Sequence, residues 1–281
     1  MTTVLLASAT AALFGCADFL GGVASRRVSA LAVTATSHAL SLALLVFVLL
    51  FTLPVAVARA DLTWGALAGI CGGFGVAALY AALAMGRMSV IAPVTAALSG
   101  ALPATYDLVR GSTVRPTGMV GIVLALVAVV IVSVASDPAE DERATSPASI
   151  GWALLAGVGF AGAFVAFSMT GTESGVWPLV SARVASVSLM VVIALARRTG
   201  PIVGRSALAP TLAAGVLDTS ANITMLAAIR IGPLAIASVL GSLYPVATVL
   251  LARVFLGERV RGLQGAGIAL ALVAVGLTAL P

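Results

Sequence analysis

Four ionisable side chains lie well away from the ends of long apolar stretches of this sequence, where charged groups are rare: Asp18, His38, Arg183 and Asp218. A charge inside hydrocarbon costs about 2.5–3.5 kcal/mol or more, so such groups usually face the interior of a helix bundle or a wet cavity. A carboxylate in that position can take up and release a proton. An arginine can pair with an acid or receive an anionic group of a substrate. These four side chains are therefore the first candidates for a functional site, although His38 can equally serve as a hydrogen-bonding group between helices.

The two aspartates each belong to a row of small and polar residues at helical spacing. The rows are Ser8, Ala11, Gly15, Asp18 and Gly22, and Thr211, Gly215, Asp218, Asn222 and Met225. Residues three and four apart share one face of a helix. We therefore expect both rows to line a cavity, and Asn222 joins the candidates. The alternative is a permanent ion pair of Arg183 with Asp218 or Asp18 that locks the helices together.

Prolines inside two apolar stretches indicate further candidates. Pro93 and Pro103 lie in the stretch 88–109, and Pro245 lies in the stretch 232–254. A proline removes an internal hydrogen bond and clashes with the preceding turn, so it kinks the helix. The polar residues near these kinks, together with a tyrosine late in the third stretch, are candidate lining residues: Ser99, Ser242, Tyr244 and Tyr80. Packing and hydrogen bonding between helices are the alternative roles for them.

The composition indicates which elements must position these groups. Of the 281 residues, 61% are hydrophobic and only 9% are charged. Apolar runs of about 20 residues, the length that crosses about 30 Å of hydrocarbon as a helix, recur along the chain. This pattern predicts an all-α integral membrane protein with ten transmembrane helices. The expected spans are 3–23, 30–53, 62–84, 88–109, 116–135, 149–170, 176–196, 207–229, 232–254 and 261–280.

The second half of the sequence repeats the first at a shift of 146 residues (267 − 121 = 146). The shift aligns GIVLALVAV at 121–129 with GIALALVAV at 267–275, and it pairs Phe14 with Phe160. One ungapped offset covers nearly the whole chain. Each half holds five apolar segments, and an odd number places the second half upside down in a membrane. The sequence therefore predicts two inverted five-helix repeats, an arrangement common in secondary transporters.

The shift also shows where the two halves differ. Arg183 falls opposite position 37, beside His38 (183 − 146 = 37). The acids have no acidic counterpart: Asp18 pairs with Phe164 and Asp218 with Gly72 (164 − 146 = 18; 218 − 146 = 72). We expect symmetry to provide the scaffold and its rocking motion, and these two acids to provide substrate choice and coupling.

The domain organisation follows from the repeat. Residues 1–135 form the first five-helix repeat, and residues 149–281 form the second. Between them, 136–148 is rich in acidic residues and proline and reads as a flexible linker. About 200 residues are used by ten spans, so no soluble catalytic domain or ATPase module fits in the remainder.

Several other classes of function are disfavoured. All fifteen basic residues are Arg and most flank apolar runs, which is typical of topology signals rather than of a nucleic-acid groove. Cys16 and Cys71 have neither metal-ligand spacing nor an expected disulfide partner. The GxGxxG match at 157–162 lies inside an apolar span, where helix packing explains it. We expect no cofactor, no metal and no nucleic-acid partner, and a chain that is not an enzyme.

The residues that follow the eighth span carry a resemblance to a known family. They include AAIRIGPLAIASVL at 227–240, LYPVATVLL at 243–251, LGER at 256–259 and GAGI at 265–268. Together they are similar to the signature of the EamA family of the drug/metabolite transporter superfamily. The first half matches more loosely, with Gly-Ser-Thr at 111–113 in place of Gly-Glu-Arg. The opening FGCADFLGG at 14–22 resembles the first-helix pattern, with Asp18 where many members are neutral.

The resemblance implies two EamA repeats, and transport of amino acids, nucleosides, drugs or other metabolites. It also implies that both termini lie in the cytoplasm. The arginines favour the opposite orientation, since ten lie in or beside odd-numbered loops and four in or beside even-numbered ones. The orientation of the termini therefore stays open.

Our leading hypothesis is a multi-pass transporter of the cell (inner) membrane that exports a small metabolite by alternating access, with proton exchange as the favoured driving force. Its partners would be a small-molecule substrate, the lipid bilayer and protons, and it would act as a monomer or homodimer. One alternative is a flippase for a lipid-linked carrier, with a groove open to the bilayer and Arg183 meeting a phosphate. Another is a membrane scaffold or sensor, with fixed ion pairs and no enclosed polar cavity.

Overall fold

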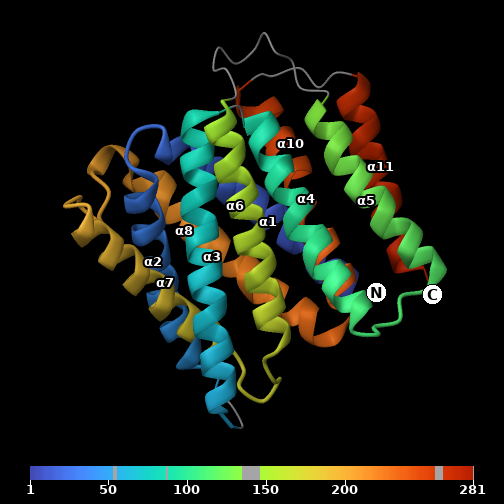
Figure 1. Cartoon of the computed structure of the whole chain (residues 1–281), viewed down its shortest axis with the longest axis horizontal. Coiled ribbons are helices and arrows are strands. Elements are labelled where there is room, and N and C mark those ends of the chain that lie inside the picture. The colour runs from blue at the N-terminus through green and yellow to red at the C-terminus, as the bar shows by residue number, and fades with distance from the viewer. Residues whose placement is uncertain (53–55, 87, 135–145, 257–261, 281) are drawn as a thin grey trace.

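The computed structural model describes residues 1–52, 56–86, 88–134, 146–256 and 262–280, and these are folded into helices with no strand among them. Most of the predicted linker, 136–148, lies outside the described residues. The helices are α1 (Thr2–Ser25), α2 (Ala30–Leu49), α3 (Arg59–Met85), α4 (Met88–Val109), α5 (Pro116–Val134), α6 (Pro147–Ser168), α7 (Trp177–Ala196), α8 (Arg205–Ile231), α9 (Leu234–Gly241), α10 (Tyr244–Leu256) and α11 (Gly262–Ala279). Figure 1 shows them as one bundle of tilted helices.

Nine of the predicted spans correspond to single helices, and the ninth span does not. Where the sequence predicts one kinked helix over 232–254, the structure has α9 and α10, separated at Ser242 and Leu243. Proline lacks the N–H that would continue the ladder, and Pro245 lies in the first turn of α10, directly after this break. The fourth span, where the sequence predicts kinks at Pro93 and Pro103, is a single helix, α4, that continues through both prolines.

Six of the helices in the described part of the chain are long and apolar enough to cross a membrane: α1, α2, α3, α6, α7 and α8. Shorter apolar stretches lie in α5, across α9 and α10, and in α11. Large side chains such as Leu5, Phe51 and Leu195 are exposed on the outside of the bundle. A soluble protein rarely exposes so many large apolar groups, and lipid would cover them in a membrane. The chain is therefore a multi-pass membrane protein.

The shift of 146 residues also relates the helix boundaries. Helix α3 covers residues 59–85 and α8 covers 205–231, which are the same positions after the shift (59 + 146 = 205; 85 + 146 = 231). Both helices end at a glycine in an extended conformation, Gly86 and Gly232. The repeat in the sequence is thus a repeat of helices and of the signals that end them.

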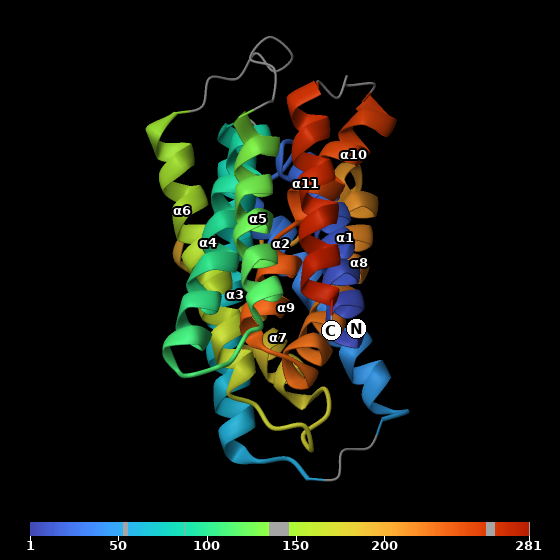
Figure 2. The ribbon, with the colours of Figure 1, turned by 90° about the vertical axis from the view of Figure 1, so that its right-hand side faces the viewer.

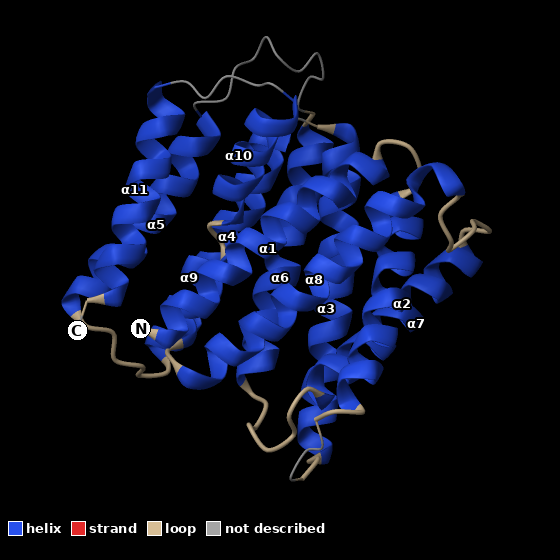
Figure 3. Cartoon of the chain, turned by 180° about the vertical axis from the view of Figure 1, so that it is seen from behind, coloured by secondary structure: helices blue, strands red, loops and turns tan. Residues whose placement is uncertain are grey.

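The helices of the two halves are interleaved. Helix α1 packs along α8, and their counterparts α6 and α3 pack along each other. In the same way α2 packs on α7, and α5 packs on α11. The related helices α5 and α11 run in opposite directions: α5 rises toward the top of Figure 1, whereas α11 descends from the top toward the C-terminus. The start of α1 and the end of α11 lie close together, as Figures 2 and 3 show.

Small residues permit the close approach of these helices. A Cβ at Gly69 of α3 would collide with the backbone of Ala182 in α7. The equivalent glycine of the second half, Gly215 of α8, lies against the backbone of Ser37 in α2, which a Cβ would approach to 2.9 Å. In a membrane, helices associate through such backbone contact because lipid provides no hydrophobic driving force between them. These two contacts hold α7 and α2 against the core of the bundle.

One local expectation is wrong. The spacing of Asp107 and Arg110 predicts an i,i+3 ion pair, but none forms between them in the described structure. Asp107 instead accepts hydrogen bonds from the Ser112 hydroxyl (2.6 Å) and from the backbone N–H of Ala235 (2.8 Å), while Arg110 donates to the Tyr106 hydroxyl (3.1 Å). Ala235 lies in the first turn of α9, where backbone N–H groups lack helical partners. Asp107, at the end of α4, therefore caps the N-terminus of α9.

Candidate functional site

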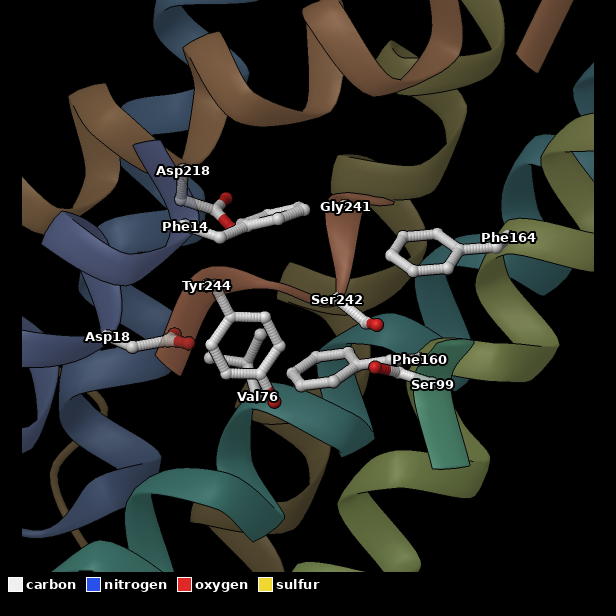
Figure 4. A pocket seen from close by; sticks show the side chains of 10 residues that line it. All are labelled: Phe14, Asp18, Val76, Ser99, Phe160, Phe164, Asp218, Gly241, Ser242 and Tyr244. Atoms are coloured by element: carbon white, nitrogen blue, oxygen red, sulfur yellow. The ribbon is translucent and has the colours of Figure 1, made fainter. Parts of the chain in front are cut away.

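A buried pocket lies where helices of both halves meet. Its lining residues come from α1, α3, α4, α6, α8 and the α9–α10 region: Phe14, Asp18, Val76, Ser99, Phe160, Phe164, Asp218, Gly241, Ser242 and Tyr244. Figure 4 shows these side chains arranged around a common space. The space open to the centre of a water molecule is ≈ 30 Å³. Since one water needs about 10–15 Å³ of this kind, the pocket in this conformation admits a few waters and no metabolite.

The two candidate acids both line this pocket, but the other members of their two polar rows, Asn222 included, are not among its lining residues. Asp18 comes from α1 in the first half and Asp218 from α8 in the second, and each side chain is exposed to only a small extent. Their surroundings differ. No hydrogen bond or ion pair joins Asp18 to any residue in the described part of the chain, whereas Asp218 is held by several. The pocket thus has one unpaired carboxylate and one paired one.

Asp218 is held by a cluster of polar side chains behind the pocket. The guanidinium of Arg183, on α7, donates to the Asp218 carboxylate and forms a salt bridge with it. Arg183 Nε also donates to the Ser41 hydroxyl at 2.8 Å. Asn222, one turn along α8, donates to Asp218 Oδ1 at 3.2 Å. The ion pair that the sequence leaves as an alternative is therefore present, and it is between Arg183 and Asp218.

His38 belongs to the same cluster, as its position beside the counterpart of Arg183 suggests. Its Nε2 lies 3.2 Å from Arg183 Nη1, and its Nδ1 lies 3.0 Å from the Ser186 hydroxyl. A guanidinium has only donors, so His38 Nε2 accepts, the ring is neutral, and Nδ1–H donates to Ser186. His38 is 1% exposed and does not line the pocket. It therefore acts here as a hydrogen-bonding link between α2 and α7.

The remaining candidates divide into lining and packing residues. Ser99, Ser242 and Tyr244 line the pocket, but their hydroxyls donate to backbone carbonyls, Tyr244 to Ala92 O at 3.1 Å. Tyr80 is not a lining residue; its ring packs against Gly21 of α1, so close that a Cβ there would collide with it. The side chains of the lining that can carry a carboxylate charge are those of the two aspartates.

The candidates chosen from the sequence omit the aromatic lining. Phe14, Phe160 and Phe164 line the pocket, and the rings of Phe14 and Phe164 lie 6.4 Å apart between centroids. The signal was present in the repeat, because the shift pairs Phe14 with Phe160 and Asp18 with Phe164. Equivalent positions on α1 and α6 thus face the same space. The sequence also gives no reason to single out Ser41 and Ser186, which complete the polar cluster.

Nothing among the described residues forms a group of three or more His, Cys, Asp or Glu side chains that could hold a metal ion. Cys16 and Cys71 are both free thiols.

Comparison with known proteins indicates the class of function to which the pocket belongs. Residues 147–280 match the sequence model of the EamA-like transporter family. The matched residues span most of the second half of the chain. This match confirms the EamA resemblance predicted from the motifs. The first half of the chain, which fits the motifs more loosely, lies outside the matched residues. Members of that family are transporters and not enzymes, so the match indicates a membrane transporter in general.

A solved crystal structure shares the fold of this chain with a TM-score of 0.75. The two sequences are 19% identical, and the match covers 99% of this chain and 96% of the other. At this identity the likeness concerns the fold alone. No curated protein matches the sequence.

Proposed function

We propose that this chain is a secondary active transporter that exports a small metabolite across the cell (inner) membrane in exchange for protons. The observation that carries the proposal is that Asp18 and Asp218, contributed by different halves, line one buried pocket inside an otherwise apolar bundle. Ionisable groups held at this depth generally belong to substrate or proton pathways. Asp18 is the better proton carrier of the two, because no cation or hydrogen-bond donor of the described chain holds its carboxylate.

The architecture we propose is ten membrane spans arranged as two inverted repeats, 1–135 and 149–281, with α9 and α10 together forming the ninth span. The matching helix boundaries, the reciprocal packing and the opposite directions of related helices support it. A broken helix at the repeat interface is a recurrent feature of binding sites in secondary transporters. The break at Ser242 lies beside the pocket, which agrees with such a role.

The position of the pocket supports a mechanism of alternating access. Its walls come from both halves, and its ≈ 30 Å³ is too small for a metabolite. Entry of a substrate therefore requires the helices of one half to move relative to those of the other. A rocking motion around a fixed central site would open the pocket first to one side of the membrane and then to the other.

The alternative functions have less support. A flippase would direct Arg183 at a phosphate, but this guanidinium is bound to Asp218, Ser41 and His38 and does not line the pocket. A scaffold would fix all the buried charges in ion pairs and enclose no polar cavity. Asp18 is unpaired and faces a cavity, which favours transport.

The test is transport by purified protein in liposomes across an imposed pH gradient, with a panel of metabolites inside and a pH-sensitive dye reporting proton flux. We expect substrate-dependent proton movement for the wild type and none for Asp18→Asn, which keeps the shape of the side chain. Glu173→Gln removes an exposed carboxylate outside the pocket and is the matched control. Proton movement that is unaffected by Asp18→Asn and Asp218→Asn would refute coupling through these acids. Absence of movement for every compound would refute transport.

A further inference from the structure

Helices α1 and α6, which form two walls of the pocket, carry different side chains at positions that the repeat makes equivalent. Helix α1 presents Phe14 and Asp18, and α6 presents Phe160 and Phe164, each pair one turn apart and related by the shift of 146 residues. In Figure 4, Asp18 and Phe164 lie on opposite sides of the space. Duplication has therefore preserved an aromatic residue on both walls, while one wall alone carries a carboxylate. A ligand between these walls meets a charged end and an aromatic end.

The charges around the pocket do not cancel. Asp218 is paired with Arg183, so together these two groups contribute no net charge. Asp18 has no such partner, and the sequence contains no lysine that could supply one. The other titratable group that lines the space, Tyr244, directs its hydroxyl to Ala92 O. An ionised Asp18 therefore gives the pocket a net charge of −1.

We propose that the pocket selects a small monovalent organic cation, whose ammonium group binds at Asp18 and whose apolar body packs between Phe160 and Phe164. This inference rests on the proposed transport function and specifies its substrate class. An unpaired carboxylate in an apolar pocket attracts a cation, and aromatic faces bind the positive charge and the adjoining carbon atoms.

Other ligand classes fit these walls poorly. An anion would meet Asp18, and the one arginine of the adjoining cluster, Arg183, is already bound by the Asp218 carboxylate. A zwitterion would leave its own carboxylate without a cation among the described lining residues. An uncharged apolar molecule would bury the Asp18 carboxylate without compensation, which is unfavourable. Of these classes, a cation is the one that satisfies the carboxylate and uses the aromatic wall as well.

The test is binding to detergent-purified protein by titration calorimetry, with three probes of similar size. Benzyltrimethylammonium is the cation, N,N-dimethylbenzamide is the uncharged probe, and 3-phenylpropionate is the anion. We expect the wild type to bind the cation at least tenfold more tightly than the other two. Asp18→Asn should weaken cation binding at least tenfold, and Phe164→Leu should weaken it by a smaller factor without changing the order of the three probes. Glu173→Gln should bind like the wild type.

Each other outcome has a definite meaning. Preference for the anion or the uncharged probe, or cation binding that Asp18→Asn leaves unchanged, overturns the substrate class while transport can stand. Binding of none of the probes also overturns it, provided that a melting curve shows the protein to be folded. Cation binding with no movement of the cation in liposomes preserves the site and refutes the transport function on which the inference rests.

Discussion

Arg183 and Asp218 form a buried ion pair that joins α7 to α8 behind the pocket. The pair fixes one of the two pocket carboxylates and leaves Asp18 as the unpaired one. Since α7 and α2 both contact this cluster, the geometry of Asp218 depends on helices that do not themselves line the pocket.

Removing Arg183 should therefore be more damaging than removing the whole pair. Arg183→Met leaves the buried carboxylate of Asp218 uncompensated, and breaking a buried pair in this way costs about 3–5 kcal/mol. We expect Arg183→Met to lower the melting temperature of the purified protein strongly, and Arg183→Met combined with Asp218→Leu to recover part of the loss. A double variant that is less stable than Arg183→Met would contradict this account.

The contact between α3 and α7 depends on Gly69. Gly69→Ala places a Cβ against the backbone of Ala182, which cannot move aside as a side chain could. Overpacking of this kind costs about 1–3 kcal/mol or more, so a lower melting temperature and more aggregation in size-exclusion chromatography are expected. Gly151→Ala is the matched control, because a Cβ there meets nothing within 4 Å. If both substitutions behaved alike, the close approach at Gly69 would not limit the packing.

The loop between α6 and α7 is held at one end of the bundle by Asp61 and Arg230. Asp61 accepts hydrogen bonds from the backbone N–H of Gly171 (3.0 Å) and the Ser174 hydroxyl (2.5 Å), and Arg230 donates to the carbonyls of Gly171 (2.6 Å) and Gly175 (2.7 Å). Hydrogen bonds to charged groups contribute about 1.5–3 kcal/mol each.

Asp61→Asn should therefore release this loop. We expect faster hydrogen exchange at Gly171 and its neighbours, measured by mass spectrometry, with little change in the core of α3. Thr63→Ala removes an exposed hydroxyl that bonds only within its own helix turn, to Ala60 O, and should leave the exchange of the loop unchanged. Equal exchange in wild type and Asp61→Asn would show that the carboxylate does not hold the loop.

Tyr244 should act through its ring rather than its hydroxyl. The hydroxyl donates its proton to Ala92 O, so that proton is not available to a ligand. Tyr244→Phe loses this bond, worth about 0.5–1.5 kcal/mol of stability, but should keep binding of benzyltrimethylammonium within about twofold. Tyr244→Leu should weaken that binding by a larger factor, because it removes the aromatic face. Calorimetry on both variants measures the difference, and a greater loss for Tyr244→Phe would assign the hydroxyl to the ligand.

Much of this architecture could be predicted from local pattern. Apolar runs of the length of a membrane span predicted nine of the helices, with boundaries correct to within a few residues. The shift of 146 residues also predicted that α3 and α8 begin and end at equivalent positions. The break at Ser242 was harder to foresee, since a proline such as Pro245 can kink a helix or separate two. Pro93 and Pro103 show the difference, because α4 continues through both.

The sequence by itself determined the helices, their repeat and the unusual presence of Asp18 and Asp218 in apolar stretches. Helical periodicity and hydrophobicity are properties of neighbouring residues, so they can be read along the chain. The tertiary structure decided that Arg183 pairs with Asp218, that His38 joins them, and that Asp18 is left to face aromatic side chains. These relationships join helices from both halves of the chain, and they depend on close packing at small residues whose partners no local pattern specifies.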